Sequence, residues 1–303
     1  MKRKTYVFWL LGLPCLLLVV IFHYIPMGGI IMAFQEFDID KGILRSPFIG
    51  FKNFEFFITS GAFARVLKNT LFLNFLFLTS GTIASVLLAL SLNEIRNRFF
   101  AKLSQSLSFL PFFLSWAVVA MILDSIINYD IGALSSFLKS IGLPRIAFYT
   151  TAGVWPGLFT ILRLWKGAGA GAIIYLAALT GIDPEIHEAA AIDGASRLQI
   201  IRYINTPLLK PTVIILTLMS IGGMMYGDLG MIYPIVRDQG MLFSTTDVID
   251  TYVYRALRTM GTEYGMLTAV GLFQSLVGLV LVLGSNQLVR IYSAREGEDY
   301  ALF

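Results

Sequence analysis

Long apolar runs separated by polar segments dominate this chain. A helix needs about 20 consecutive apolar residues to cross a bilayer. Six stretches meet that length, at residues 7–32, 68–92, 103–127, 154–176, 208–226 and 265–289. Between them, residues 35–67, 128–153 and 227–264 are long, aromatic and mixed in charge, whereas residues 93–102 are short and basic. The pattern predicts an all-α integral membrane protein with six transmembrane helices.

The composition supports this fold class. Of the 303 residues 56% are hydrophobic and 14% are charged, whereas soluble domains carry about a quarter charged residues. The basic start Met1–Lys4 precedes an apolar run too long for a signal peptide, so we expect the first span to be retained. A single cysteine, Cys15, and two distant histidines make a disulfide framework, a metal site or a haem site unexpected. The net charge of +4 fits membrane flanks rather than a nucleic-acid partner.

The distribution of Lys and Arg predicts the topology. Six spans place both termini on one side of the membrane, and the totals of Lys and Arg on the two sides are nearly equal. The density of basic residues is highest at 2–4 and 96–102, so the positive-inside rule places both termini in the cytoplasm. We expect the chain to have three parts. Residues 1–67 form the first span and an external segment, residues 68–290 form the transmembrane core, and residues 291–303 form a cytoplasmic tail. The core includes a long loop at 180–211 between two spans.

The loop at 180–211 begins with strong helix signals. Asp183 is a good N-cap, and Pro184 suits the first helical position because its missing N–H costs nothing there. The alanine-rich run 188–191 favours a narrow helix, which Gly194 is expected to end. The spacing therefore predicts a short helix that presents a small-residue surface.

A second short helix is predicted directly after the first. Ser196 and Gln199 have the spacing of a capping box, and the helix should run to about Asn205, where Pro207 limits it. An ordinary solvated loop is the alternative. It is disfavoured because helix–helix connections usually have about 2–8 residues and because small residues stand where a solvated helix would carry Lys and Glu. The two helices should form an elbow that protrudes into the cytoplasm.

The residues of this elbow resemble the EAA loop of ABC importer permeases. The matching residues are Glu188, Ala189, Ala190, Asp193, Gly194, Ala195 and Pro207, and Ile204 and Pro211 also fit the pattern. The usual Leu-Pro is Thr206-Pro207 here, which is a small departure. Further segments, at residues 68–70, 110–116, 174–179 and 250–254, resemble the carbohydrate-uptake branch, and most of all its permeases for polysaccharide-derived oligosaccharides such as alginate or pectin fragments.

The resemblance implies a type I ABC importer transmembrane domain with cytoplasmic coupling helices. Its expected function is that of a permease subunit for a sugar, with an oligosaccharide as the expected cargo, in a bacterial cytoplasmic membrane. The chain would hydrolyse nothing and bind no cofactor itself, since ATP and Mg²⁺ would sit on a partner ATPase. Expected partners are a second homologous permease, two ATPase subunits, an extracytoplasmic sugar-binding protein and membrane lipid. The seven elbow residues would couple the permease to the ATPase.

Gly167–Gly171 invites comparison with a phosphate-binding loop. No Lys-Ser or Lys-Thr follows these glycines and they lie within an apolar span, so the P-loop interpretation fails. Small residues at such spacing instead favour close helix packing.

Five polar residues are candidates for the substrate path: Arg163, Lys166, Tyr226, Asp228 and Tyr233. Charges inside a span should face protein or water rather than lipid, so Arg163 and Lys166 either pair with a neighbouring helix or line a wet path. Tyr226, Asp228 and Tyr233 combine aromatic faces with a carboxylate, as sugar binding requires, but the tyrosines also fit an interfacial aromatic belt. Asp124 is a weaker candidate.

Two other functional classes remain as alternatives. A proton-coupled secondary transporter would need acidic relays near the middle of the membrane and usually repeated halves, and neither is visible. A membrane enzyme would need a catalytic or metal-binding cluster, which two isolated histidines and one cysteine do not provide.

Overall fold

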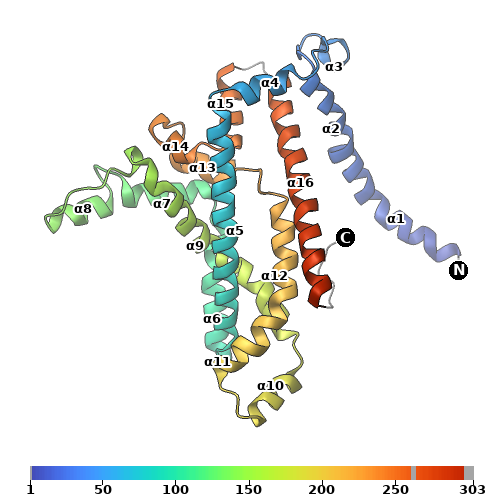
Figure 1. Ribbon diagram of the computed structural model, residues 1–303. Helices are drawn as coiled ribbons and strands as arrows, with labels where there is room; N and C mark the ends of the chain where they lie inside the picture. Colours follow the sequence, from blue (N-terminus) through green and yellow to red (C-terminus); the bar gives the residue numbers. More distant parts are fainter. Residues whose placement is uncertain (1, 261–263, 297–303) are drawn as a thin grey trace. The chain divides into compact units, whose positions relative to one another are not determined.

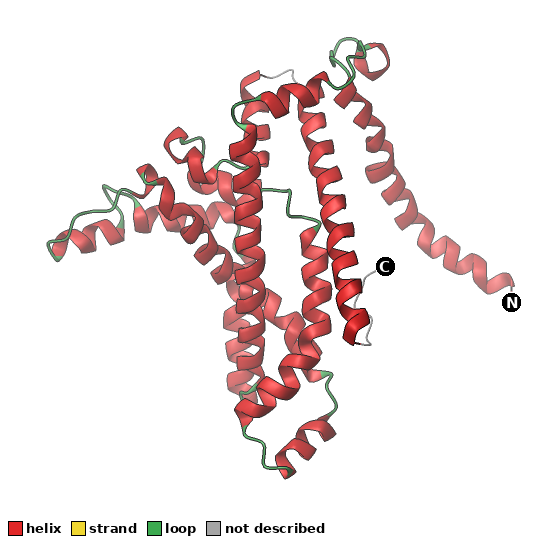
Figure 2. Ribbon diagram, in the orientation of Figure 1, coloured by secondary structure: helices red, strands yellow, loops and turns green. Residues whose placement is uncertain are grey.

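The computed structural model describes residues 2–260 and 264–296, and these are almost entirely helical (Figures 1 and 2). Within them, the only β-structure is one isolated bridge between Gln35 and Phe48. The chain divides into two units. Unit 1 comprises Met1–Phe63 and Val253–Leu276, and unit 2 comprises Ala64–Tyr252 and Val277–Phe303.

The helices have the following bounds. Unit 1 holds α1 (Lys2–Val19), the π-helical turn η1 (Val20–Tyr24), α2 (Ile25–Met27), η2 (Gly28–Phe34), α3 (Gly42–Arg45) and α4 (Lys52–Thr59). Unit 2 holds α6 (Arg98–Phe109), η3 (Leu110–Phe113), α7 (Trp116–Ile127), α8 (Ala133–Ser140), η4 (Phe148–Thr150), η5 (Ala152–Val154), α9 (Trp155–Thr180), α10 (Pro184–Ile192), α11 (Arg197–Ile200), the π-helical turn η6 (Ile201–Asn205), α12 (Thr206–Ile221), α13 (Leu229–Val236), η7 (Gly240–Leu242) and α14 (Phe243–Thr246). The helices α5 (Phe63–Asn93), α15 (Ile249–Met260) and α16 (Tyr264–Glu296) contribute to both units.

Five helical segments are long and apolar enough to cross a membrane. They are Trp9–Phe34, Phe63–Asn93, Ala152–Thr180, Arg197–Ile221 and Tyr264–Ala294. A sixth span results if the bent pair Arg98–Phe113 and Trp116–Ile127 crosses as one. The predicted all-α membrane fold is confirmed for the described residues.

The segment predicted as a span at 103–127 is not one continuous helix. The helix axis bends by 95° between Phe113 and Trp116. Ser115 has an extended backbone (ψ 151°), and its hydroxyl accepts a hydrogen bond from the Val118 N–H at 3.3 Å, which starts α7 as a new helix. Pro111, in the 3-10 segment just before the break, has no N–H to donate. The overall apolar character of residues 103–127 did not reveal the Ser115 N-cap, at which a second helix begins.

The prediction that Pro207 limits the second short helix is wrong. The helix runs without interruption from Arg197 to Ile221, so the fifth span begins earlier than residue 208 and ends before residue 226. The backbone N–H of Thr206 bonds to the Ile201 carbonyl, which is the wide π-helical spacing. A π-helical turn changes the hydrogen-bond pattern immediately before the proline, and the helix passes through Pro207 instead of stopping.

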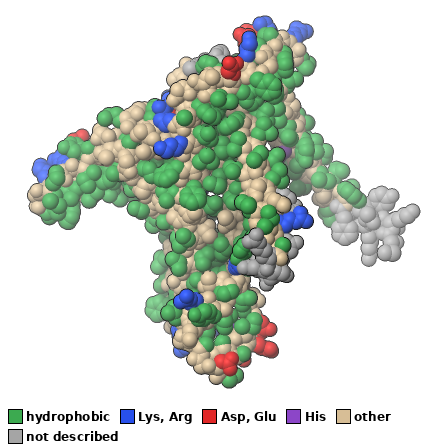
Figure 3. Space-filling view, in the orientation of Figure 1, with side chains coloured by type: hydrophobic (Ala, Val, Ile, Leu, Met, Phe, Trp, Pro, Cys, Tyr) green, Lys and Arg blue, Asp and Glu red, His purple; other side chains and the backbone are tan. Residues whose placement is uncertain are grey.

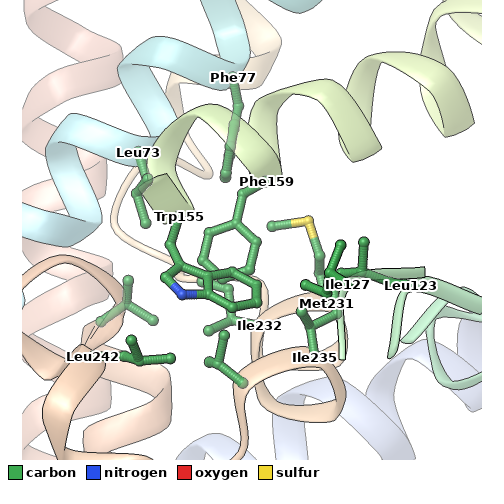
Figure 4. Packing of buried hydrophobic residues seen from close by; sticks show 12 residues of the cluster. Leu73, Phe77, Leu123, Ile127, Trp155, Phe159, Met231, Ile232, Ile235 and Leu242 are labelled. Carbon is green, nitrogen blue, oxygen red and sulfur yellow. The ribbon is translucent and has the colours of Figure 1, made fainter. Parts of the chain in front are cut away.

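A hydrophobic cluster fixes the start of α9 in unit 2 (Figure 4). Trp155 and Phe159 are fully buried, and their ring centroids lie 5.3 Å apart. Leu73 and Phe77 of α5 pack beside them, and Ile232 comes from α13. A second cluster joins α5, α9 and α12 further along. The first cluster packs α5 and α13 against the start of α9, and the second packs α5 and α12 against the rest of α9.

Close packing of glycines on α9 confirms the helix-packing interpretation of Gly167–Gly171 at two of three positions. A Cβ added at Gly169 would lie 1.9 Å from the Ser108 carbonyl oxygen of α6. One added at Gly171 would lie 2.4 Å from Oγ of Ser85 on α5. At Gly167, nothing lies within 4 Å.

Polar contacts bind the segment around α14 to the beginning of α5. The Arg65 guanidinium pairs with the buried carboxylate of Asp247 at 3.0 Å. Asn69 donates to the Asp247 carbonyl at 3.0 Å, and the Thr70 hydroxyl accepts the Ile249 N–H at 2.9 Å. Because Asp247, Asn69 and Thr70 are buried, these hydrogen bonds stabilise the segment between α13 and α15.

In unit 1, aromatic contacts join segments that are distant in sequence. Phe57 of α4 packs edge-on against Phe63 and Phe273, with ring centroids 5.0 and 5.9 Å away. At the start of α16, a Cβ on Gly265 would lie 2.5 Å from the Gln35 carbonyl oxygen. The first turn of α16 therefore depends on a residue without a side chain.

Candidate substrate cavity and coupling segment

Unit 2 contains an open cavity of about 640 Å³. Its walls come from α5, α9, α12 and the residues that follow α12. Most of the lining is apolar, and the polar side chains in it are Asn74, Thr82, Ser85, Arg163, Tyr175, Ser220, Tyr226 and Asp228. A mostly apolar hollow with a few convergent polar groups is typical of small-molecule sites.

The sequence candidates Arg163 and Asp228 meet in this cavity. Nη1 of Arg163 on α9 lies 2.6 Å from Oδ2 of Asp228, although the residues are 65 positions apart. Their side chains remain 40% and 31% exposed. The guanidinium also covers the Phe77 ring, at 4.8 Å from its centroid. Pairing with a neighbouring element and lining a cavity thus occur together, and the sequence had left these as alternatives.

Asp228 has an unusual backbone conformation. Its φ of 46° lies in the left-handed region, which few residues other than glycine adopt but which Asp tolerates. Oδ1 caps α13 by accepting the Met231 N–H at 3.2 Å. Both carboxylate oxygens therefore have a partner within the chain.

The turn before Asp228 is held from two sides. Asn74 of α5 donates to the carbonyls of Met224 and Tyr226 at 3.0 and 2.8 Å. The Gly227 N–H bonds to the Asp250 carboxylate, and a Cβ at Gly227 would lie 2.4 Å from a methyl group of Val248. Asn74 and Asp250 were not candidates from the sequence, because neither stands out from its neighbours without the fold.

Lys166 and Tyr233 lie outside the cavity lining. Nζ of Lys166 donates to the Phe112 carbonyl at 2.8 Å and lies 5.1 and 5.3 Å from the ring centroids of Phe112 and Trp116. This cation therefore spans the break between η3 and α7. Tyr233 is on α13 and is partly buried.

Asp124 belongs to a separate polar group at the end of α7. It accepts a hydrogen bond from the Asn128 amide at 3.3 Å. Burial first, and then the nearby Asp124 carboxylate, which disfavours the phenolate, together raise the pKa of the half-buried Tyr149 to about 12. Asp124 lies outside the lining of the large cavity.

The predicted elbow forms two helices at one end of unit 2, below α5 in Figure 1. The Asp183 side chain accepts the Glu185 N–H at 3.0 Å, which confirms it as the N-cap of α10. Gly194 ends the helix with φ 79°. The Ala195 N–H reaches the Ala190 carbonyl at 2.9 Å, and the Gly194 N–H reaches the Ala191 carbonyl at 3.1 Å. This pair of bonds is a Schellman turn, in which glycine avoids the steric cost of positive φ.

The second helix of the elbow is tied back to the first. The capping box of Ser196 and Gln199 is present. His187 of α10 makes a 2.8 Å hydrogen bond to Oδ1 of Asn205, whose side chain is buried within the π-helical turn. The His187–Asn205 bond, between residues 18 positions apart, was not among the expectations from the sequence. Arg197 lies 3.7 Å from Glu94 at the end of α5.

The residues of the EAA-like segment are largely uncovered. Glu188, Ala189, Asp193 and Gly194 are exposed, and Ala190 and Ala195 are partly exposed. Ile192 and Leu198 are 87% and 74% exposed. Figure 3 shows acidic side chains gathered at this end of unit 2. The segment thus presents small, acidic and apolar side chains that this chain leaves without cover.

In the part of the chain that the structure describes, no group of three or more His, Cys, Asp and Glu is placed to hold a metal ion. The polar groups that line the cavity can bind and orient a ligand. The elbow can transmit movement to α12, because its first helix is hydrogen-bonded to Asn205, which directly precedes α12.

The sequence matches the family described as binding-protein-dependent transport system inner membrane component over residues 81–295. The chain belongs to this family. The prediction of an ABC importer permease is thereby confirmed, and relatives of this chain are named as transport system permease proteins.

Two relatives from Bacillus subtilis (strain 168) resemble this permease over most of their length. Protein LplB is 34% identical over 303 residues, which cover 100% of this chain and 92% of the relative. The polygalacturonan/rhamnogalacturonan transport system permease protein YteP is 35% identical over 282 residues, which cover 93% and 87%.

The fold of the permease also matches a solved structure. A chain of a bacterial ABC transporter involved in the import of the acidic polysaccharide alginate superimposes with a TM-score of 0.84 and 34% identity, covering 94% of this chain and 96% of that chain. A chain of a bacterial alginate ABC transporter in complex with an alginate pentasaccharide-bound periplasmic protein gives a TM-score of 0.84 and 33% identity, covering 96% of both chains.

Proposed function

We propose that this permease carries an oligosaccharide into a bacterial cell as part of an ATP-driven importer. The observation that carries the proposal is the full-length likeness, in sequence and fold, to a chain of the alginate importer. The cavity adds support, since its walls combine the aromatic rings of Phe77, Tyr175 and Tyr226 with polar groups from three helices. Sugars bind through stacking on rings and through hydrogen bonds, so this lining suits them.

The elbow supplies the proposed attachment point for an ATPase subunit. Its exposed alanines allow close approach of another protein, and Ile192 and Leu198 offer apolar anchors. The Schellman turn at Gly194 and the His187–Asn205 bond make α10 and the start of the fifth span a connected unit. A push on α10 is therefore expected to move α12, which lines the cavity.

The remaining partners follow from the family and its solved relative. A second, related permease would close the open side of the cavity, and two ATPases would bind the two elbows. A binding protein on the outer side would deliver the sugar, and the complex of the alginate transporter with a pentasaccharide-bound periplasmic protein supports such a partner. In this arrangement both termini and the elbow face the cytoplasm, and membrane lipid surrounds the apolar spans.

Membership in a binding-protein-dependent family favours this ATP-driven system over a proton-coupled carrier. The ionic groups in the cavity agree with that choice, because Asp228 is already paired with Arg163 and caps a helix. A carboxylate in two such contacts is a poor proton relay.

Purification of the tagged permease from cells that express its neighbouring transport genes tests the proposal. We expect a second permease and an ATPase to be recovered with it, and we expect the reconstituted complex to take up an oligosaccharide only with its binding protein. Recovery of the permease alone, together with uptake that needs no binding protein, would refute the assembly.

A further inference from the structure

Arg163 differs from the other residues that line the cavity in its positive charge. Of the described residues that line it, Arg163 is the only cation and Asp228 the only anion. Arg163 also lines a smaller neighbouring cavity of about 160 Å³. A guanidinium at the junction of two hollows can reach a ligand in either of them.

Most of the hydrogen-bonding capacity of Arg163 is unused. A guanidinium carries five N–H donors in a planar fork. In the structure Nη1 meets one carboxylate oxygen of Asp228, the flat face of the group lies over Phe77, and no other acceptor contacts it among the described residues. The side chain is 40% exposed. Its remaining donors are therefore available to a ligand in the cavity.

In contrast to Arg163, Asp228 has both of its carboxylate oxygens engaged within the chain. One of its oxygens caps α13 and the other takes the Arg163 bond. Asn74 and Asp250 hold the turn just before it, so the carboxylate is fixed beside the guanidinium before any ligand arrives. Asp228 thus acts as a resident counter-ion, which lowers the cost of keeping a cation inside the span.

We propose that Arg163 binds a carboxylate of the transported sugar, so that the cargo is an acidic oligosaccharide built from uronate units. The proposal rests on the proposed function. The planar fork matches a carboxylate with two parallel hydrogen bonds, which a neutral hydroxyl cannot reproduce. Both a relative and a solved neighbour carry the names of polysaccharides of this acidic class.

The test uses the complete complex in liposomes with its binding protein. Initial uptake rates are measured for a short oligogalacturonate and for the same compound after chemical reduction of its carboxyl groups to alcohols. The ratio of the two rates is compared among the wild type and the variants Arg163→Gln, Arg163→Lys and Asp228→Asn. Because the binding protein is the same in every arm, its own preference cancels from the comparison.

Arg163→Gln should lower the acidic-to-reduced ratio by about tenfold or more, because a charged hydrogen bond to the carboxylate is lost. Arg163→Lys should lower the ratio less than Arg163→Gln does, because lysine keeps the positive charge but lacks the planar set of guanidinium donors. Asp228→Asn removes the competing carboxylate while the amide oxygen still caps α13, so the ratio should hold or rise. A ratio that falls for Arg163→Gln and does not fall for Asp228→Asn would distinguish ligand binding from a merely structural ion pair, which the loss of either partner would break.

Lys166→Gln is the matched control. It removes a cation three residues further along α9 that lies outside the cavity lining, so it should leave the ratio unchanged. The proposal is overturned if Arg163→Gln and Lys166→Gln lower uptake of both sugars equally, or if Asp228→Asn lowers the ratio as much as Arg163→Gln does. Wild-type uptake of the reduced compound alone would also overturn it, with the proposed function intact.

Two further results distinguish a failure of the Arg163 proposal from a failure of the proposed function. If the wild type imports only the acidic compound, Arg163→Gln must lose about tenfold of that uptake while Lys166→Gln retains it, and equal losses overturn the proposal. If the wild-type complex imports no oligosaccharide at all, the proposed function itself fails.

Discussion

Replacement of Gly194 by alanine should weaken attachment of the ATPase to the elbow. The residue ends α10 at φ 79°, and its N–H and that of Ala195 complete the Schellman turn. Nothing lies within 4 Å of a Cβ added there, so the substitution introduces no clash. Its cost is the backbone strain of an L-residue in the left-handed region, about 1–2 kcal/mol.

That strain corresponds to a factor of about 5–30 in the equilibrium between the intact and the opened turn. If the ATPase binds only the intact turn, its apparent affinity falls with the intact fraction, by up to the same factor. Gly194→Asn should lose less, because asparagine adopts the left-handed region more readily.

Gly181→Ala is the matched control in the same loop. Gly181 has φ −85°, in the ordinary helical region, and an added Cβ would make a normal contact at 3.4 Å. The assay is titration of the purified ATPase onto the permease in detergent, with the Kd as readout. Equal Kd values for Gly194→Ala, Gly181→Ala and the wild type would refute the role assigned to this turn.

Three further predictions follow from the packing and the topology. Gly169→Leu would press a side chain into a backbone carbonyl of α6 and should abolish folded yield, whereas Gly167→Ala should be tolerated; equal yields would contradict the tight α6–α9 contact. Arg65→Gln removes the guanidinium that pairs with the buried Asp247 carboxylate and should cost roughly 1–3 kcal/mol, seen as a lower Tm in detergent; an unchanged Tm would contradict it. With the native cysteine replaced, Leu44→Cys (98% exposed in the wild type) should react with an impermeant thiol reagent on intact cells and Ser196→Cys should not; the reverse pattern would invert the topology.

Local features of the elbow could be predicted from the sequence. The Asp183 cap, the capping box of Ser196 and Gln199, and the stop at Gly194 all appear where the spacing placed them. Each depends on side chains and backbone groups within a few residues of one another, so neighbouring sequence is sufficient to specify them.

Features that depend on distant residues could not be predicted. Arg163 and Asp228 were both candidates, but nothing in the sequence joins two residues 65 positions apart. Two local features were missed as well, the break before Trp116 and the passage of a helix through Pro207, because average hydropathy does not register one serine cap or one π-helical turn. Asn74 is one of three asparagines in the apolar helix α5, and its role becomes visible only in the structure, where it donates a hydrogen bond to the turn after α12.

The energy source of uptake tests the central claim most directly. The complete complex is reconstituted into liposomes with the binding protein outside and with either ATP and Mg²⁺ or an imposed proton gradient as the only driving force. Our account predicts sugar accumulation with ATP, persistence of that accumulation after a protonophore is added, and none with the gradient alone. Accumulation driven by the gradient in the absence of ATP would contradict it.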